Sequence, residues 1–594
     1  MITRTLLHRR TTGPIVLLAA LSLAALSLAA GCSASGTATD AQAASAGQSG
    51  SASSASQSST ASESSGTAWT TISEAIASAS AGATTADILA ANAQVEQAST
   101  PQDDAGTVDA SGATTIALSG TAATVQGEGA SAEGSMVTIT EAGTYVVSGQ
   151  TSNGRIVVAA PGAQVRIVLD GASITSSDGP AIDIQDAGEA IVVLAEGSTN
   201  ALADGAVYAD TSSEAPTAAL FSSDTLTLTG TGSLSVTGSH RDGISSKNGL
   251  IITGGTTIEV TAADDGLRGK DYVAISSGRL TINAGGDAVK SSEDTDETKG
   301  FVSLGEAWLT LVSGDDGITA ATDVTVAGTT LEITAGGGQA AAVPQEDPGT
   351  GAQSGEESQD AAPSPKGISA GVSYTQDSGT LTLNTADEGL QAPFVTISGG
   401  ELSVTSGDDG INASNGDHVI EGHESADSES DDGSVLTISG GAVQVGYAAS
   451  DGIDSNGSAH VTGGRVVIGG STGSMDGAID ANGATTLVGL TGAPAVAEGD
   501  TITLSGASEW SLTSAISAAD ITVLGLEEGR EYTVSSTSGG SATATASALS
   551  AGMGGPMAGG QAPGGAGGPG GRSGQEPGGQ APEGQGDQGS SAQG

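Results

Sequence analysis

The chain has 594 residues, with 68 Asp and Glu against 16 Lys and Arg, which gives a formal net charge of −52 at pH 7. A field of that sign repels phosphate backbones and anionic lipid headgroups, so we expect no nucleic-acid partner. The single cysteine excludes an internal disulfide framework. Cations are the partners that this charge favours.

The N-terminus has the features of a secretory signal. Arginines within the first ten residues precede an apolar stretch, 15–30, that is too short for a comfortable membrane span. The segment 1–32 resembles a bacterial lipoprotein signal, although Ala29 stands where that family usually has Leu. The resemblance implies that Cys32 carries a lipid, and that the protein is extracellular and anchored to the cell membrane.

Two further segments are poor in large apolar residues. Residues 33–112 are rich in Ser, Ala and Thr and predict a disordered stalk, with weak helix around Ile72 to Val95. Residues 541–594 are rich in Gly, Pro and Gln and predict a disordered tail.

Between these segments, a phrase of an acidic residue, a glycine and a branched apolar residue recurs about every 22 residues. Its copies are Asp242-Gly243-Ile244, Asp265-Gly266-Leu267, Asp316-Gly317-Ile318, Glu388-Gly389-Leu390, Asp409-Gly410-Ile411 and Asp451-Gly452-Ile453, with degenerate copies at Asp287-Ala288-Val289 and Asp476-Gly477-Ala478. Two short alternating strands follow most copies, and no helix-length segment separates them. The pattern favours an all-β solenoid, with three short strands per circuit and circuits about 4.8 Å apart.

An antiparallel β-sandwich is the alternative fold, but it leaves the regular acidic corner unexplained. We expect the repetitive domain to span 113–493, with loop insertions at 291–299, 337–365 and 416–432. Longer strands in 494–540 predict a β cap over the C-terminal end.

The acidic corners predict a metal site. Stacked circuits would bring these carboxylates into a column, and Ca²⁺ would relieve their mutual repulsion. The alternative is that each Asp-Gly pair is only a turn. The predicted metal ligands are Asp242, Asp264, Asp265, Asp287, Asp315 and Asp316, followed by a second set of Asp408, Asp409 and Asp451, whose register the insertions blur.

The motif set resembles a family of bacterial β-helical carbohydrate-binding proteins over roughly 113–540. The phrases that carry the resemblance include Asp264-Asp265-Gly266-Leu267-Arg268-Gly269-Lys270-Asp271 and Asp451-Gly452-Ile453-Asp454-Ser455-Asn456-Gly457. The resemblance implies a right-handed parallel β-helix, similar to β-helical pectate lyases, that binds Ca²⁺ and plant polysaccharide such as cellulose or pectin-like acidic glycans. The chain departs from the family at Ala288, where Gly is usual, and in its few aromatic residues.

Basic residues are scarce, so their placement is informative. Arg268, Lys270 and Lys290 lie within the acidic corners and are candidate ligand-binding residues. In a calcium-dependent lyase, a lysine removes the proton beside a uronate carboxylate, and Lys290 is the candidate base. The alternative is that these cations balance the carboxylates, because nearby carboxylates raise a lysine pKa. The histidines, His418 among them, lack metal-ligand spacing and are expected in loops.

We therefore expect a monomeric, lipid-anchored protein of the cell surface that binds Ca²⁺ and polysaccharide. A calcium-dependent polyuronate lyase and a structural adhesin or spacer remain as alternatives.

Overall fold

The structure, a computed structural model, describes residues 68–96, 99–107, 111–343, 364–416, 418–427, 430–470 and 477–551. The predicted signal with Cys32, most of the 337–365 insertion and the tail from residue 552 lie outside these residues. No described helix is long and apolar enough to cross a membrane.

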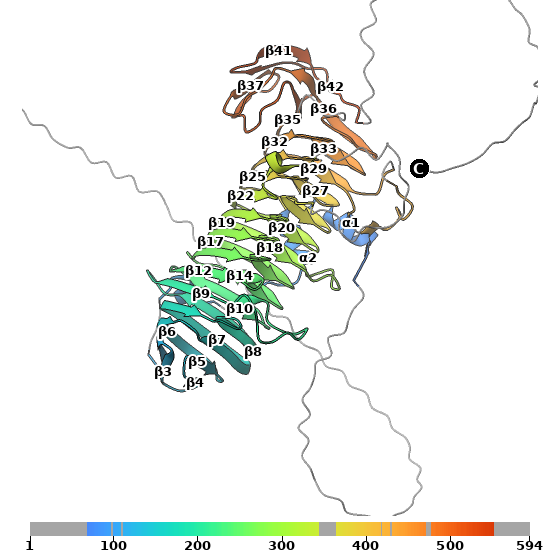
Figure 1. Cartoon of the computed structure of the whole chain (residues 1–594). Helices are drawn as coiled ribbons and strands as arrows, with labels where there is room; N and C mark the ends of the chain where they lie inside the picture. Colours follow the sequence, from blue (N-terminus) through green and yellow to red (C-terminus); the bar gives the residue numbers. More distant parts are fainter. Residues whose placement is uncertain are drawn as a thin grey trace, which may run out of the picture. The chain divides into compact units, whose positions relative to one another are not determined.

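Most strands belong to one 36-stranded sheet that winds round a single hydrophobic core (Figure 1). Each circuit of the chain places a strand segment in each of three walls. Each segment pairs in parallel with the corresponding segment of the next circuit, as Ile244 does with Leu267 and Val260 with Ile282. Identical kinds of side chain therefore align from circuit to circuit.

The first wall carries the recurring acidic phrase, and the second and third walls follow it in each circuit. The first wall contains β10 (Ala218–Ser222), β13 (Asp242–Ser246), β16 (Leu267–Gly269), β18 (Val289–Ser291), β20 (Ile318–Ala320), β23 (Ile368–Ala370), β26 (Leu390–Gln391), β29 (Ile411–Ala413) and β33 (Ile453–Ser455). The second wall contains β11 (Leu226–Gly230), β14 (Gly249–Ile252), β21 (Asp323–Val326), β24 (Ser373–Gln376), β27 (Phe394–Ile397), β31 (Val435–Ile438), β34 (Ser458–Val461) and β36 (Thr485–Ala493). The third wall contains β12 (Ser233–Gly238), β15 (Thr257–Ala262), β22 (Thr330–Ala335), β25 (Thr380–Thr385), β28 (Glu401–Ser406), β32 (Ala442–Tyr447) and β35 (Arg465–Gly470). Two long strands pass from the second wall into the third, β17 (Tyr272–Ala284) and β19 (Phe301–Ser313).

The hydrophobic pattern explains the third wall directly. In β15, Ile258, Val260 and Ala262 are buried while Glu259 and Thr261 between them are exposed, so alternate side chains enter the core. The branched residue of each recurring phrase is also core: Ile244, Leu267 and Ile318 are fully buried.

The two ends of the sheet are built differently from its middle. The N-terminal end contains β2 (Thr114–Gly120), β3 (Ala122–Gln126), β4 (Ala130–Glu133), β5 (Met136–Ile139), β6 (Gly143–Thr151), β7 (Arg155–Thr175), β8 (Ile182–Leu194) and β9 (Thr199–Ala203). The pairs β2–β3 and β4–β5 are antiparallel. At the C-terminal end, β39 (Ile521–Leu524) pairs antiparallel with β35 and β36, and β42 (Ser547–Ala548) pairs antiparallel with β36.

In the predicted cap range, the structure has a separate four-stranded antiparallel sheet that extends past residue 540. It contains β37 (Thr501–Gly506), β38 (Trp510–Thr513), β40 (Glu531–Ser536) and β41 (Gly540–Thr545).

The all-β prediction is confirmed, but the prediction of a right-handed parallel β-helix with circuits of about 22 residues is wrong. The sheet closes as one barrel-like wall round the core, and its ends use antiparallel pairs. Its circuits are not uniform, because Ile318 pairs with Ile368 and Ile411 with Ile453 across insertions. A longer loop between two strands costs little additional closure entropy, so the chain tolerates insertions between paired strands. The period of the sequence therefore does not fix the geometry of the wall.

The segment before the sheet is ordered in part, unlike the predicted disordered stalk, and its helices α1 and α2 lie within 72–95, where weak helix was predicted. Its described residues, which we call the N-terminal strap (68–96 and 99–107), contain β1 (Thr71–Ile72), α1 (Glu74–Ser80), α2 (Thr85–Ala91) and α3 (Pro101–Asp104). β1 pairs with β30 (Val419–Ile420), Ala93 N–H donates to the Thr298 carbonyl, and Arg166 pairs with Asp103 at 2.8 Å. Composition suggested disorder because Ala and Ser dominate, but a few large side chains anchor the strap to the sheet.

Candidate functional site

An acidic column follows the edge of the first wall. The register of the buried Ile, Leu and Val residues places Asp242, Asp265, Asp287 and Asp316 in successive circuits. Carboxylate oxygens of the column accept backbone hydrogen bonds from the following circuit. Asp316 N–H donates to Asp287 Oδ1 at 3.0 Å, and Lys366 N–H donates to Asp316 Oδ1 at 2.7 Å. Part of the Asp265, Asp287 and Asp316 carboxylates is therefore structural.

In the next circuit of the column, a positively charged residue takes the place of an acidic one. Lys366 occupies the acidic position of the next circuit, because Ile368 pairs with Ile318. Its Nζ lies 3.3 Å from Asp387 Oδ2 and 3.8 Å from Glu388 Oε2. The sequence Lys366-Gly367-Ile368 is a copy of the recurring phrase in which lysine replaces the acidic residue, so a pattern defined by an acidic residue does not include it.

Burial raises the pKa of several column carboxyls. The pKa of Asp265 rises to about 6 and that of Asp316 to about 7, with neighbouring carboxylates adding to the effect. The pKa of Glu388 rises to about 7 and that of Asp409 to about 9, again chiefly through burial. Asp316, Glu388 and above all Asp409 need positive charge nearby to be fully ionised at neutral pH.

The predicted ligand-binding cations lie in ion pairs. Arg268 Nη1 is 3.6 Å from Asp265 Oδ2, and Lys270 Nζ is 3.1 Å from Glu293 Oε2. Lys290 Nζ is 2.5 Å from Asp287 Oδ2. Arg268 and Lys290 therefore neutralise part of the column, whereas Lys270 pairs with a residue of the 291–299 loop.

The environment of Lys290 disfavours the role of a base. Burial alone lowers its pKa, but the carboxylates of Asp287 and Asp265 outweigh burial, so the pKa is raised. A lysine held protonated cannot accept a proton from a substrate.

Two groups of three described carboxylates could hold a metal ion. Within each group, one ligand atom per residue lies within 4.8 Å of the others; the groups are Asp287, Asp315 and Asp316, and Asp451, Asp454 and Asp480. Of the other predicted ligands, Asp264 pairs with Arg241 at 2.9 Å, and Asp242 accepts a hydrogen bond from Thr217. Asp242, Asp264, Asp265, Asp408 and Asp409 belong to neither group.

The first group fits a divalent cation poorly. Both oxygens of Asp316 already accept hydrogen bonds, from Lys366 N–H and from the Thr319 hydroxyl at 3.0 Å. The Lys290 ammonium lies against Asp287 and would repel a second cation. The register of the column between Asp242 and Asp316 is regular, but a cation at Asp287, Asp315 and Asp316 would compete with these contacts.

The second group fits better. Burial, together with the like charges of Asp480 and Asp432, raises the pKa of Asp454 to about 6. Next to Asp454 in the strand register lies Asn412, whose buried Oδ1 accepts no hydrogen bond from any described residue. Carboxylate and amide oxygens of this kind are the ligands that Ca²⁺ prefers.

Sequence reasoning missed Asp480 through a one-residue error in register. The prediction aligned Ala478 with Ile453, whereas Ile453 bridges to Ile479. The repeated pairs Ile453-Asp454 and Ile479-Asp480 are the signal that would have found it. Asp476, part of the predicted copy, lies outside the described residues.

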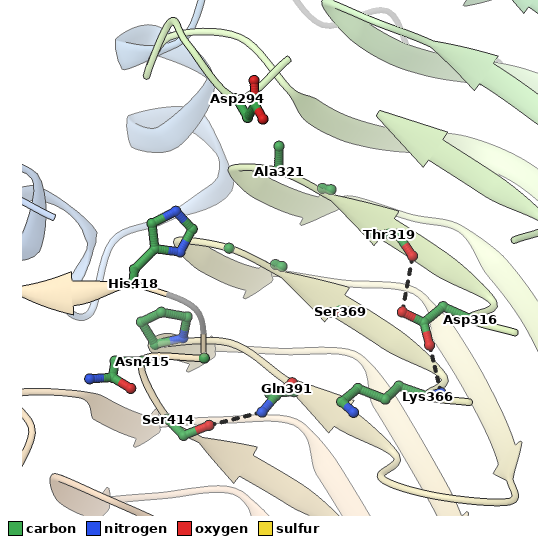
Figure 2. Close-up of a pocket in the computed structure, with 15 residues that line it drawn as sticks. Asp294, Asp316, Thr319, Ala321, Lys366, Ser369, Gln391, Ser414, Asn415 and His418 are labelled. Carbon is green, nitrogen blue, oxygen red and sulfur yellow. Dashed lines mark hydrogen bonds between the residues drawn. The ribbon is translucent and has the colours of Figure 1, made fainter. Parts of the chain in front are cut away.

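A groove of about 480 Å³ crosses the first wall over β20, β23 and β26. Thr319, Ser369 and Gln391, which are register neighbours, lie between its two sides. Figure 2 shows Asp316 and Lys366 on one side and Asp294 and His418 on the other. The sides and floor together offer carboxylate acceptors, an ammonium donor, hydroxyls and an amide.

Loops complete the far side of the groove. His418 and Asp294 belong to the predicted insertions 416–432 and 291–299. The His418 ring packs on Trp69 of the strap, with ring centroids 4.4 Å apart. Such a site can hydrogen-bond a ligand rich in hydroxyl groups along three successive strands.

A family and a curated protein match part of the chain. Residues 133–410 match the family described as carbohydrate-binding domain-containing protein. A protein of that description from Acetivibrio thermocellus is 36% identical over 122 residues, which cover 20% of this chain and 43% of that protein. The chain thus spans less than half the length of this curated relative.

Among solved structures, the chain is similar to the polysaccharide lyase-like protein from C. thermocellum, in a gadolinium derivative. The identity is 30% and the TM-score 0.36, over 38% of this chain and 92% of that chain. The predicted resemblance to carbohydrate-binding proteins is therefore supported for the segment 133–410, which is similar to carbohydrate-binding domain-containing proteins.

Proposed function

We propose that this protein binds polysaccharide in the groove over β20, β23 and β26. The observation that carries the proposal is the continuous row Thr319, Ser369 and Gln391 between two polar sides. Most of the groove lies within 133–410, the segment similar to carbohydrate-binding proteins. Adjacent parallel strands repeat about every 4.8 Å, so a linear chain laid across them meets a polar group at each step.

Within the predicted plant cell-wall glycans, we propose an acidic, pectin-like chain rather than cellulose. No Trp, Tyr or Phe is among the described residues that line the groove, so it lacks a flat aromatic surface. Lys366 offers an ammonium beside the groove, and its pKa is raised because Glu388, Asp387 and Asp316 outweigh the effect of burial. A protonated lysine favours a carboxylated sugar.

We also propose that Asp451, Asp454 and Asp480 hold Ca²⁺, with the neighbouring Asn412. A bound cation would stabilise the ionised form of these buried carboxyls. The surface location and the lipid anchor on Cys32 remain part of the proposal, on the sequence alone.

Lys290 gives the lyase alternative no support, because Asp287 and Asp265 raise its pKa.

A groove-filling substitution tests the binding site. Ser369→Trp would place a large side chain on the groove floor without removing any ion pair. Thr310→Trp is the matched control, since Thr310 is exposed in β19 on the third wall. We expect Ser369→Trp to weaken retention on polygalacturonate at least about tenfold, and Thr310→Trp to leave it unchanged.

Retention is measured with the full chain on immobilised polygalacturonate, a neutral glucan and cellulose, with Ca²⁺ or with chelator. If the folded protein retains no glycan, or if Ser369→Trp binds like the unsubstituted protein, the proposal is wrong. Retention on cellulose alone would overturn the proposed ligand class.

A further inference from the structure

The far side of the groove is made of two loops that are remote in sequence. One loop, between β18 and β19, contributes Asp294; the other, between β29 and β30, contributes Asn415 and His418. Neither loop segment belongs to a strand of the first wall, so the wall alone does not fix their positions.

The N-terminal strap joins these two loops. Trp69 N–H donates to the Asp294 carbonyl at 2.9 Å, and the Trp69 ring lies against His418 with centroids 4.4 Å apart. Two residues further on, β1 forms a parallel pair with β30. Residues 69–72 therefore contact both loops at once.

The strap supplies the ladder partner of β30. Val419 N–H donates to the Thr70 carbonyl and Glu421 N–H to the Ile72 carbonyl, each at 2.8 Å. Among the described strands, β1 and β30 form a two-stranded sheet of their own. If β1 detaches, these amide groups lose their acceptors.

A small hydrophobic cluster fixes this attachment to the second wall. Ile72 is fully buried and packs with Val372, Phe394 and Ile420. The side chain of Glu421 also accepts the backbone N–H of Glu74 at 3.0 Å. The strap is thus held closely where the groove wall depends on it.

We propose that the N-terminal strap regulates the groove: Trp69 and β1 hold its far side in the ligand-binding shape, so polysaccharide binding and strap docking stabilise each other. This inference rests on the proposed function. Trp69 is a positioning residue, acting through Asp294 and His418. By linkage, the factor by which the docked strap raises glycan affinity equals the factor by which bound glycan favours strap docking.

Substitution within the full chain tests the coupling. We expect Trp69→Ala to weaken retention on polygalacturonate about tenfold, within the usual range of such couplings. Trp69→Phe, which keeps a ring against His418, should restore most of the affinity. Ile88→Ala is the matched control, because Ile88 is a buried strap residue in α2, which packs on β21 and β24 and contains neither Trp69 nor a residue of β1.

A second measurement separates coupling from a merely structural role. Saturating polygalacturonate should slow hydrogen exchange at the Val419 and Glu421 amides by about the factor that Trp69→Ala costs in affinity. Full affinity in Trp69→Ala, or exchange that is insensitive to glycan, would overturn the coupling while leaving the groove intact. Unchanged binding in Ser369→Trp would instead remove the groove, and the coupling with it.

Discussion

The role of an acidic residue in the column depends on what each of its two carboxylate oxygens contacts. In Asp316, Oδ1 accepts the backbone N–H of Lys366 and Oδ2 accepts the Thr319 hydroxyl. Only an acceptor is needed in these bonds, and a negative charge is not. Burial and the charges of Asp287 and Asp315 raise the pKa of Asp316 to about 7. The negative charge of Asp316 therefore destabilises the folded state near neutral pH.

Substitutions of Asp316 separate the acceptor from the charge. Asp316→Asn keeps Oδ1 and removes the charge, whereas Asp316→Ala leaves the Lys366 N–H without an acceptor. We expect the asparagine variant to be more stable than the alanine variant by about 1–3 kcal/mol at pH 8. Chemical denaturation measures the difference.

The same asparagine variant locates the metal. It should retain any rise in melting temperature on adding Ca²⁺, because the proposed ion lies with Asp451, Asp454 and Asp480. Asp454→Asn should lose that rise. The reverse pattern would place the ion in the column at Asp287, Asp315 and Asp316.

At the scale of the element, the glycine of each recurring phrase is set by the third wall. A Cβ on Gly266 would lie 2.4 Å from Ile282 Cγ2 and 2.6 Å from the Ala288 carbonyl oxygen. Gly243 and Gly452 face Val260 and Ile468 in the same way. A β-branched residue on the third wall therefore requires glycine on the first.

Ala288 takes the place of the glycine in a circuit whose third-wall residue, between Ile282 and Ile333, is not β-branched. The register places Leu311 at the third-wall level between Ile282 and Ile333. Leucine has no branch at Cβ, which leaves room for the methyl group of Ala288. The sequence shows Ala288 as a departure from the family, and the structure supplies the reason.

This pairing predicts a compensating substitution. Gly266→Ala should destabilise the protein by about 1–3 kcal/mol through overpacking. Adding Ile282→Leu should recover part of that loss, giving a favourable coupling energy in a double-mutant cycle. Additive effects of the two substitutions would show that the branch at Ile282 is not the obstacle.

Sequence reasoning succeeded where a single physical constraint, burial in the core, limits the residue type. It aligned Ile244, Leu267 and Ile318 through the spacing of the recurring phrase, and all three are buried, where few side chains are tolerated. It missed Lys366, because a cation replaced the expected acid while the backbone position stayed the same. It misjudged the strap and the course of the circuits, because tertiary contacts far apart in sequence decide both.

For the whole molecule, buried carboxyls with raised pKa values govern the pH dependence of stability. Burial raises the pKa of Asp316 to about 7, that of Glu388 to about 7 and that of Asp409 to about 9, all above the usual range of a carboxyl group. Between the usual and the raised pKa values the folded state binds more protons than the unfolded state. Their contribution to stability is therefore fully present below about pH 4 and is lost as the pH rises through their folded pKa values.

We accordingly expect the melting temperature in chelator to fall between pH 5 and pH 8. Added Ca²⁺ should raise it more at pH 8 than at pH 5, because the ion favours ionised carboxylates. Scanning calorimetry at both pH values, with Mg²⁺ as the control cation, measures the effect. A melting temperature that rises with pH in chelator would contradict the assignment of these carboxyls.

The course of the strap has a mechanical consequence. Strand pairs join only neighbouring circuits, whereas the strap runs from β30 past Asp377 and Thr298 to Arg166, and so connects circuits that do not touch. A pulling force applied at the N-terminus would reach Trp69 and β1 before any circuit of the sheet. The strap would then detach first, as a separate event. The groove would therefore open under force before the strands of the sheet separate.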